Sequence, residues 1–151
     1  MVQKIDEKII KFINEHHVLT IATCNNNKPW CASCFYVYLK DENIFIFTSD
    51  IDTRHGKEFI ENPFVAGNIL LETSIINKIQ GLQFEGKIEK PTGDLKKIAE
   101  KAYLKRFPYA VIMKTELWVV KPSLLKMTHN LLGFGKKLIW TENEGNKTIK
   151  K

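Results

Sequence analysis

Long apolar runs, an even set of cysteines and the common catalytic signatures are all missing from this chain of 151 residues. No apolar run approaches the roughly 20 residues that a helix needs to cross a bilayer, so we expect no membrane partner. Three cysteines, and a first segment that is amphipathic with mixed charge, predict a cytoplasmic protein without a signal peptide. GxSxG, HExxH and Walker glycine motifs are absent, which leaves hydrolase and P-loop functions unsupported.

One pair of cysteines has the spacing of a metal or redox motif, Cys31-Ala-Ser-Cys34. The pair lies inside a strand pattern, where residues three apart point to opposite faces of the sheet. A structural zinc site also needs four ligands, and the sequence holds no second CxxC and no spaced histidine pair. We therefore predict no metal site and interpret the two thiols as small core or pocket-lining groups.

Composition indicates one ordinary globular domain over residues 1–151, with 44% hydrophobic and 26% charged residues. The net charge of +6 favours a ligand or partner that carries negative charge. Many lysines fall in the tail and in residues 94–106, where solubility alone accounts for them. Nucleic acid is not the expected partner, because the aromatic residues lie in apolar runs away from the lysines.

The residue pattern predicts a mainly β fold, a six- to eight-stranded antiparallel barrel with about three flanking helices. Helical spacing of apolar residues predicts helices over residues 5–16, 54–61 and 94–106. A dense turn signal spans residues 24–29, and Gly86 is expected at a bulge. The polar residues 142–151 are expected to form a frayed tail. The predicted strands are residues 18–23, 30–39, 44–47, 64–71, 82–89, 117–120, 124–128 and 138–141.

The most informative stretch runs from Ile44 to Gly67, IFIFTSDIDTRHGKEFIENPFVAG. It predicts a buried strand that leads directly into a short helix capped by Asp52 or Thr53 and ended by Asn62-Pro63. Free backbone N–H groups at the helix start, beside Arg54, make an anion site for which phosphate is the natural ligand. A purely structural strand–turn–helix with a solvated basic first turn explains the same local pattern.

These motifs together resemble the FMN-binding split-barrel superfamily, which is related to pyridoxamine 5′-phosphate oxidase. The superfamily pattern is matched by IFIFT, then Thr53-Arg54-His55, then Asn62-Pro63. Within it the chain is most similar to the uncharacterised bacterial YhbP-type family, and that resemblance runs nearly end to end. The segments that carry it are WCASCFY at 30–36, TRH at 53–55, VAG at 65–67, GLQFEG at 81–86, KAYLKRFPYA at 101–110 and THNLLGFGKKLIW at 129–140.

The resemblance implies FMN as cofactor and a homodimer with two FMN sites at the subunit interface. In such proteins one strand lines the flavin, a strand end and the following turn hold the phosphate, and a polar residue on another strand reaches the flavin. Apart from the resemblance, the loop 133–137 places a flexible glycine backbone beside Lys136 and Lys137, which suits an anionic ligand or a loop of the dimer partner. The implied cofactor-binding residues are Ala32, Ser33, Cys34, Phe35, Phe47, Thr48, Thr53, Arg54, His55, Gln83 and Lys136.

Two departures from the oxidases shape the expected function. His55 stands where the oxidases usually place a lysine, so phosphate affinity should be lower and dependent on pH. The arginine-rich C-terminal substrate segment has no counterpart, which argues against pyridoxamine phosphate as the substrate. The sequence thus predicts a flavin-dependent oxidoreductase on an unidentified small substrate, with no general acid or base standing out. The alternative is a non-catalytic binding protein that holds FMN, haem or another anionic ligand.

Overall fold

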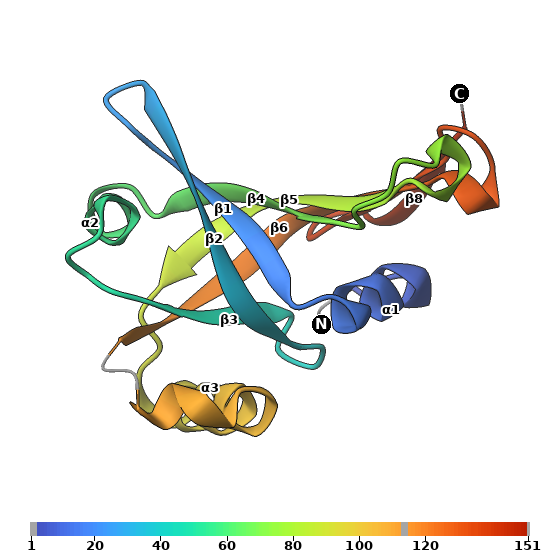
Figure 1. The fold of residues 1–151 in the computed structure, drawn as a ribbon. Coiled ribbons are helices and arrows are strands. Elements are labelled where there is room, and N and C mark those ends of the chain that lie inside the picture. Colours follow the sequence, from blue (N-terminus) through green and yellow to red (C-terminus); the bar gives the residue numbers. More distant parts are fainter. Residues whose placement is uncertain (1–2, 113–114, 151) are drawn as a thin grey trace.

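The computed structural model describes residues 3–112 and 115–150, which form an eight-stranded antiparallel sheet with three α-helices (Figure 1). The expected mainly β architecture is confirmed. The helices are α1 (Glu7–Glu15), α2 (Arg54–Glu61) and α3 (Gly93–Arg106), with short 3-10 turns η1 (Ile76–Lys78), η2 (Pro108–Ile112) and η3 (Asn130–Leu132). The strands are β1 (Val18–Asn25), β2 (Lys28–Leu39), β3 (Ile44–Ser49), β4 (Phe64–Leu70), β5 (Gln80–Glu89), β6 (Glu116–His129), β7 (Lys137–Thr141) and β8 (Gly145–Ile149).

The sheet closes on itself because β3 pairs with both β2 and β6. The strand order is β3-β2-β1-β4-β5-β6-β7-β8, and the additional β3–β6 pairing turns the first six strands into a barrel. Closure gives β3 a partner on both edges, whereas the part of β2 before Tyr36 pairs with β1 alone among the described residues. The last hairpin, β7 and β8, extends the sheet beyond the barrel along β6.

The core fills the inside of the barrel, and α1 and α2 each add apolar side chains to it. Large side chains such as Trp118, Trp140 and Phe45 are fully buried there. Helix α1 adds its apolar face at one end, and α3 packs on the outer side of β3 (Figure 1). As a result β3 is buried on both faces, as its uniformly apolar sequence predicts. In the described residues no helix is long and apolar enough to cross a membrane.

The first hairpin is tighter than the sequence indicates. Residues 24–29 were expected to form a turn, but β1 continues to Asn25 and β2 starts at Lys28. Asn26 and Asn27 alone make the turn, with φ of +50° and +60°. Asparagine tolerates this left-handed conformation, which a two-residue hairpin requires at both positions.

Strand β6 is one continuous strand where the sequence predicted two. The expected break falls at Pro122, which lies opposite Gly86 at a shift in register between β5 and β6. The bulge predicted at Gly86 is therefore confirmed. A Cβ atom on Gly86 would lie 2.4 Å from the Lys121 carbonyl oxygen, so only glycine allows this approach. Proline has no backbone N–H to donate to a neighbouring strand, but a bulge does not require that hydrogen bond, so β6 continues through Pro122.

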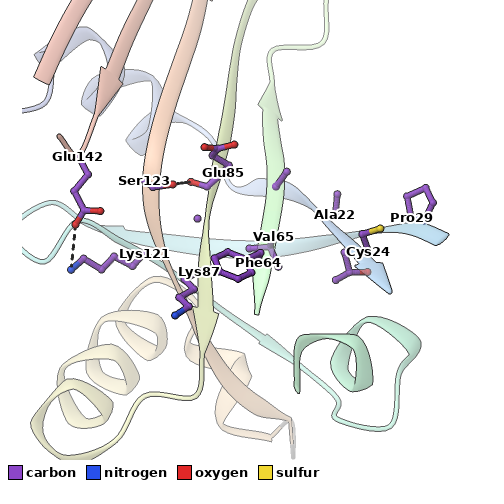
Figure 2. A pocket seen from close by; sticks show the side chains of 13 residues that line it. Ala22, Cys24, Pro29, Phe64, Val65, Glu85, Lys87, Lys121, Ser123 and Glu142 are labelled. Atoms are coloured by element: carbon purple, nitrogen blue, oxygen red, sulfur yellow. Dashed lines mark hydrogen bonds and ion pairs between the residues drawn. The ribbon is translucent and has the colours of Figure 1, made fainter. Parts of the chain in front are cut away.

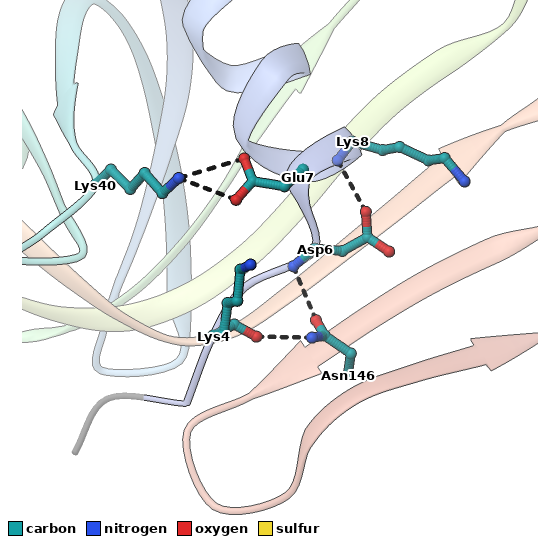
Figure 3. Close-up of polar contacts among 6 residues, drawn as sticks. All are labelled: Lys4, Asp6, Glu7, Lys8, Lys40 and Asn146. Carbon is teal, nitrogen blue, oxygen red and sulfur yellow. Dashed lines mark hydrogen bonds and ion pairs between the residues drawn. The ribbon is translucent and has the colours of Figure 1, made fainter.

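The C-terminal segment pairs with the sheet, which corrects the expectation of a frayed tail for residues 142–150; residue 151 lies outside the described residues. Residues 145–149 form β8 and pair with β7. The Asn146 side chain accepts a hydrogen bond from the Asp6 backbone N–H (3.0 Å) and donates one to the Lys4 carbonyl (2.7 Å; Figure 3). The Trp140 indole N–H donates to the Gln3 carbonyl at 3.0 Å. The two ends of the chain thus fasten each other.

We expect Asn146→Ala to lower the free energy of unfolding by about 1–2 kcal/mol, because it removes both side-chain hydrogen bonds of Asn146 to the segment before α1. Urea denaturation of the variant and the wild type measures the difference. Asn143→Ala, in the same hairpin, is the matched control, since only the backbone carbonyl of Asn143 is bonded to Gln3. An equal decrease in the free energy of unfolding in Asn146→Ala and Asn143→Ala would show that the two Asn146 side-chain hydrogen bonds do not stabilise the fold.

Candidate functional site

The start of α2 is held against the end of β3 by a dense local network. Thr53 caps the helix: its hydroxyl accepts from the Gly56 N–H (3.1 Å) and donates to the Asp50 carbonyl (2.7 Å). A Cβ atom on Gly56 would lie 2.5 Å from that same carbonyl, so the close approach needs glycine. The capping predicted from the sequence is confirmed at Thr53, and it fixes the direction in which Arg54 and His55 leave the helix.

Arg54 is held in place on two sides. Its guanidinium carbon lies 4.4 Å from the centre of the Trp30 ring, and its Nε donates to the Glu58 carboxylate at 2.9 Å. Nevertheless 44% of the side chain is exposed. The two terminal guanidinium nitrogens make no hydrogen bond to the described part of the chain, so they remain available to a ligand. A planar guanidinium with two free nitrogens suits bidentate contact with phosphate or carboxylate.

Glu58 is the buried carboxylate that orients Arg54. It accepts hydrogen bonds from the Thr23 hydroxyl and from Arg54, and both bonds lower the pKa of its carboxyl group. Glu58 is therefore ionised and paired beneath the exposed arginine. Sequence reasoning missed this residue, although the spacing of Arg54 and Glu58 by four positions on a helix was a readable signal.

His55 points away from Arg54, toward the end of β3. Its Nε2 shares a hydrogen bond with the Ser49 hydroxyl, and its ring lies edge-on to Phe59 with centroids 5.6 Å apart. Burial lowers the pKa of the imidazole, with the Glu58 charge acting weakly in the opposite direction. His55 is thus neutral at neutral pH, and it lacks the permanent charge of the lysine that it replaces.

Thr48 faces the outer side of β3, opposite to Ser49, because successive strand residues alternate. Its hydroxyl donates to the Tyr103 hydroxyl at 3.3 Å. The two residues lie at a hollow of about 440 Å³ between α3 and the first residues of β6. The predicted phosphate contacts are therefore divided between the outer side of β3 and the start of α2.

The residues predicted to line the flavin along β2 alternate between two environments. Ala32 and Cys34 face inward and pack against the core, whereas Ser33 and Phe35 face outward. Burial raises the pKa of the Cys34 thiol to about 11, which makes it a poor nucleophile. Phe35 contacts Phe107 after α3, with ring centroids 5.5 Å apart. Cys31 is exposed on the outer side, so it and Cys34 face opposite ways as expected, but the interpretation of Cys31 as a core or pocket-lining thiol is wrong.

The remaining three predicted residues are widely separated. Gln83 is exposed on the outer face of β5, opposite Asn68. The Phe47 side chain is fully buried in the core and does not reach the surface around Arg54. Lys136 lies in the loop after η3, at the far end of β6 from α2 (Figure 1). At about 3.3 Å per residue, the 14 residues of β6 cover roughly 40 Å, so one chain does not bring Lys136 to Arg54.

Sequence reasoning also missed a groove of about 740 Å³ on the outer face of the sheet (Figure 2). Small residues, Ala22, Ala66 and Gly86, form its floor, and the Phe64 ring stands at its side with 67% of the residue exposed. Charged groups rim it, including the ion pair of Lys121 with Glu142 at 3.8 Å. A flat, apolar floor with a charged rim suits a planar ring or another protein surface.

Comparison with solved structures agrees with the barrel described above. The chain is similar to a heme binding protein from Mycobacterium smegmatis, with a TM-score of 0.75 and 18% identity over 89% of this chain and 57% of that one. It is also similar to a pyridoxamine 5′-phosphate oxidase-related, FMN binding protein from Nostoc punctiforme. That match has a TM-score of 0.65 and 13% identity over 96% of this chain and 94% of the other. These likenesses concern the fold.

Sequence comparison gives the family. The pyridoxamine 5′-phosphate oxidase family model matches residues 5–129. A UPF0306 protein from Photorhabdus laumondii is 41% identical over 132 residues, which are 87% of this chain and 92% of the relative. The chain therefore belongs to the pyridoxamine 5′-phosphate oxidase-like split-barrel family and, within it, to the UPF0306 proteins.

Proposed function

We propose that this protein binds FMN and acts as a flavin-dependent oxidoreductase on a small substrate. The observation that carries the proposal is the oriented Arg54 at the start of α2, with two guanidinium nitrogens free for a phosphate, in a chain of this family. Bound FMN would supply the hydride or electron chemistry, while the protein binds, orients and shields it.

In this proposal Arg54 is the main phosphate contact. Glu58 and Trp30 fix its guanidinium before a ligand arrives, which lowers the entropy cost of binding. The first backbone N–H groups of α2 add donors, and the Thr53 hydroxyl positions them by capping the helix. Thr48 offers a hydroxyl from the other side of β3 to a part of the cofactor away from the phosphate. His55 contributes a neutral imidazole, oriented by Ser49.

The proposal includes a homodimer in which the partner completes the site. The outer sheet face exposes Phe35, Phe64 and Leu70 at 59%, 67% and 63%, an apolar surface of the kind that marks interfaces. Gln83 and Ser33 lie on the same outer face as the groove. Lys136 is too far from Arg54 to share a site within one chain, and pairing of two copies through this face would let both serve one flavin.

A second candidate is a non-catalytic protein that holds haem or another anionic ligand. This candidate is supported by the heme binding protein from Mycobacterium smegmatis, whose TM-score of 0.75 is higher than the 0.65 of the FMN binding neighbour. The absorption spectrum of the freshly purified protein separates the two. Flavin bands support the oxidoreductase proposal, and a Soret band supports the haem protein. Reoxidation of FMN during steady consumption of NADH or NADPH would then distinguish an enzyme from a carrier.

We expect Arg54→Ala to weaken FMN binding about 10- to 100-fold, because it removes charge-assisted hydrogen bonds of about 1.5–3 kcal/mol. Quenching of FMN fluorescence on titration with the protein measures the affinity. Lys101→Ala, which removes one positive charge from the exposed side of α3, should leave the affinity unchanged. A folded Arg54→Ala protein with wild-type affinity would remove Arg54 from the phosphate site.

The lowered pKa of His55 predicts how FMN affinity depends on pH. Because the imidazole titrates below its ordinary value of 6.5, it is neutral above that pH and gains charge only below it. Wild type and His55→Gln should therefore bind FMN alike near pH 8, and the wild type should gain advantage as pH falls toward about 5. The ratio of the two dissociation constants cancels titration of the FMN phosphate. If the ratio of the two dissociation constants is the same from about pH 8 to about pH 5, the charge of His55 plays no part in FMN binding.

Glu58 should give a distinct signature in stability. Hydrogen bonds from Thr23 and Arg54 hold its pKa below 4.5, so its ionised form stabilises the fold above that pH and the stabilisation disappears as pH falls through the folded pKa. The stability difference between wild type and Glu58→Gln should be constant near neutral pH and shrink below about pH 4.5. Urea denaturation at a series of pH values measures it. A stability difference between wild type and Glu58→Gln that stays the same at every pH would contradict the role of Glu58.

A further inference from the structure

A separate hollow of about 280 Å³ lies at the end of the barrel that α1 covers. It is bounded by α1, by the first residue of β5, by the end of β6 and by η3. Figure 1 places α1 and the end of β6 away from α2, so this hollow is distinct from the surface around Arg54. Its lining residues are Lys8, Lys11, Phe12, Glu15, Gln80, Met127, His129, Leu131 and Leu132.

The lining combines apolar walls with positive charge at the rim. Phe12 and Met127 are nearly fully buried and form the inner wall, while η3 adds leucines. Lys8 and Lys11 present ammonium groups from α1. One carboxylate, Glu15, lies with them and pairs with Lys11 at 3.8 Å. Two lysines against one glutamate leave a net charge of +1 around the hollow.

His129 gives this hollow an unsatisfied hydrogen-bonding group. It pairs with Gln80 across β5 and β6, so both side chains occupy the inner side of the barrel end. The His129 Nδ1 atom is buried and has no hydrogen-bond partner among the described residues. Burial and the Lys8 charge lower the pKa of the imidazole, which keeps it neutral. A buried polar atom without a partner is costly, and a ligand in the hollow toward which the His129 ring turns its Nδ1 atom would remove that cost.

We propose that this hollow binds a small amphipathic monoanion, a carboxylate that carries a short apolar chain or a single ring. The net charge of +1 matches one carboxylate, and the apolar walls match a hydrocarbon body. The volume lies just below the roughly 300–1,000 Å³ of sites for larger organic ligands, which limits the ligand to a small one.

Octanoate is a suitable probe, with acetate and 1-octanol as ligands that lack its chain or its charge. We expect octanoate to shift the His129 ring signals in NMR spectra saturably. Acetate and 1-octanol should each bind more weakly than octanoate, by a factor of at least about ten. His129→Gln assigns the ring signals among the four histidines. Equal affinity for octanoate and 1-octanol, or no saturable shift of His129 with octanoate, would overturn the proposal.

Charge variants on α1 test the same site without disturbing the core. Lys8→Gln and Lys11→Gln, both at exposed positions, should each weaken octanoate binding several-fold. Lys101→Gln on α3 loses the same charge far from the hollow and should bind as the wild type does. Equal weakening by all three variants would show that net charge alone attracts octanoate and would contradict a built site. The measurement needs no flavin, so its outcome is independent of the proposed FMN function.

Discussion

The pairing of β3 with β6 is the constraint on which the rest of this structure depends. Five residues of β3, from Phe45 to Ser49, pair with Val120 to Glu116 of β6, while β2 occupies the other edge of β3. A sheet that would otherwise end at β3 becomes a barrel, and the large aromatic core lies inside it. Because α3 covers the outer side, β3 is buried on both faces and its end cannot move freely. The short link 50–53 then places the start of α2 directly against the barrel wall.

The electrostatics of the α2 start differ from what its sequence suggests. Arg54 and His55 look like a basic pair, yet Glu58 neutralises much of the arginine charge and burial keeps the imidazole neutral. Lys57 remains as an exposed cation on the same helix. An anion here would be held mainly by directional hydrogen bonds from an oriented guanidinium and from the helix N–H groups, with little support from net charge. The overall charge of +6 is therefore a poor guide to this site.

Much of the fold was readable from local patterns, because local signals decide it. The apolar run of β3, the Thr53 cap, the Asn62-Pro63 end of α2 and the glycine bulge each follow from residues close together in the chain. Strand β8 was not readable, since a polar sequence forms a strand only through its pairing with β7 and its contacts with residues about 140 positions away. The gap predicted between residues 120 and 124 was likewise wrong, because Gly86 supplies a bulge opposite Pro122 and β6 continues through it.

The candidate site shows the same division. Arg54 and Glu58 have a helical spacing that the sequence displays, but the contacts with Thr23 and Trp30 exist only once β1 and β2 form a hairpin beside α2. The hollow at His129 depends on α1 meeting the ends of β5 and β6, which no local pattern shows. Residue types with chemistry are visible in a sequence, whereas the partners that set their charge and direction come from the closed barrel.

The alternation of β3 also limits how any ligand at this site is bound. Thr48 points to the outer hollow and Ser49 to the inner side, where it holds His55, so these neighbours cannot contact the same group from within the strand. The strand ends at Ser49 and α2 begins at Arg54. A ligand that reaches both Thr48 and Arg54 must therefore pass around the end of β3, with one part toward α3 and its anionic group at the helix start. An extended cofactor meets that requirement, and a compact anion alone does not.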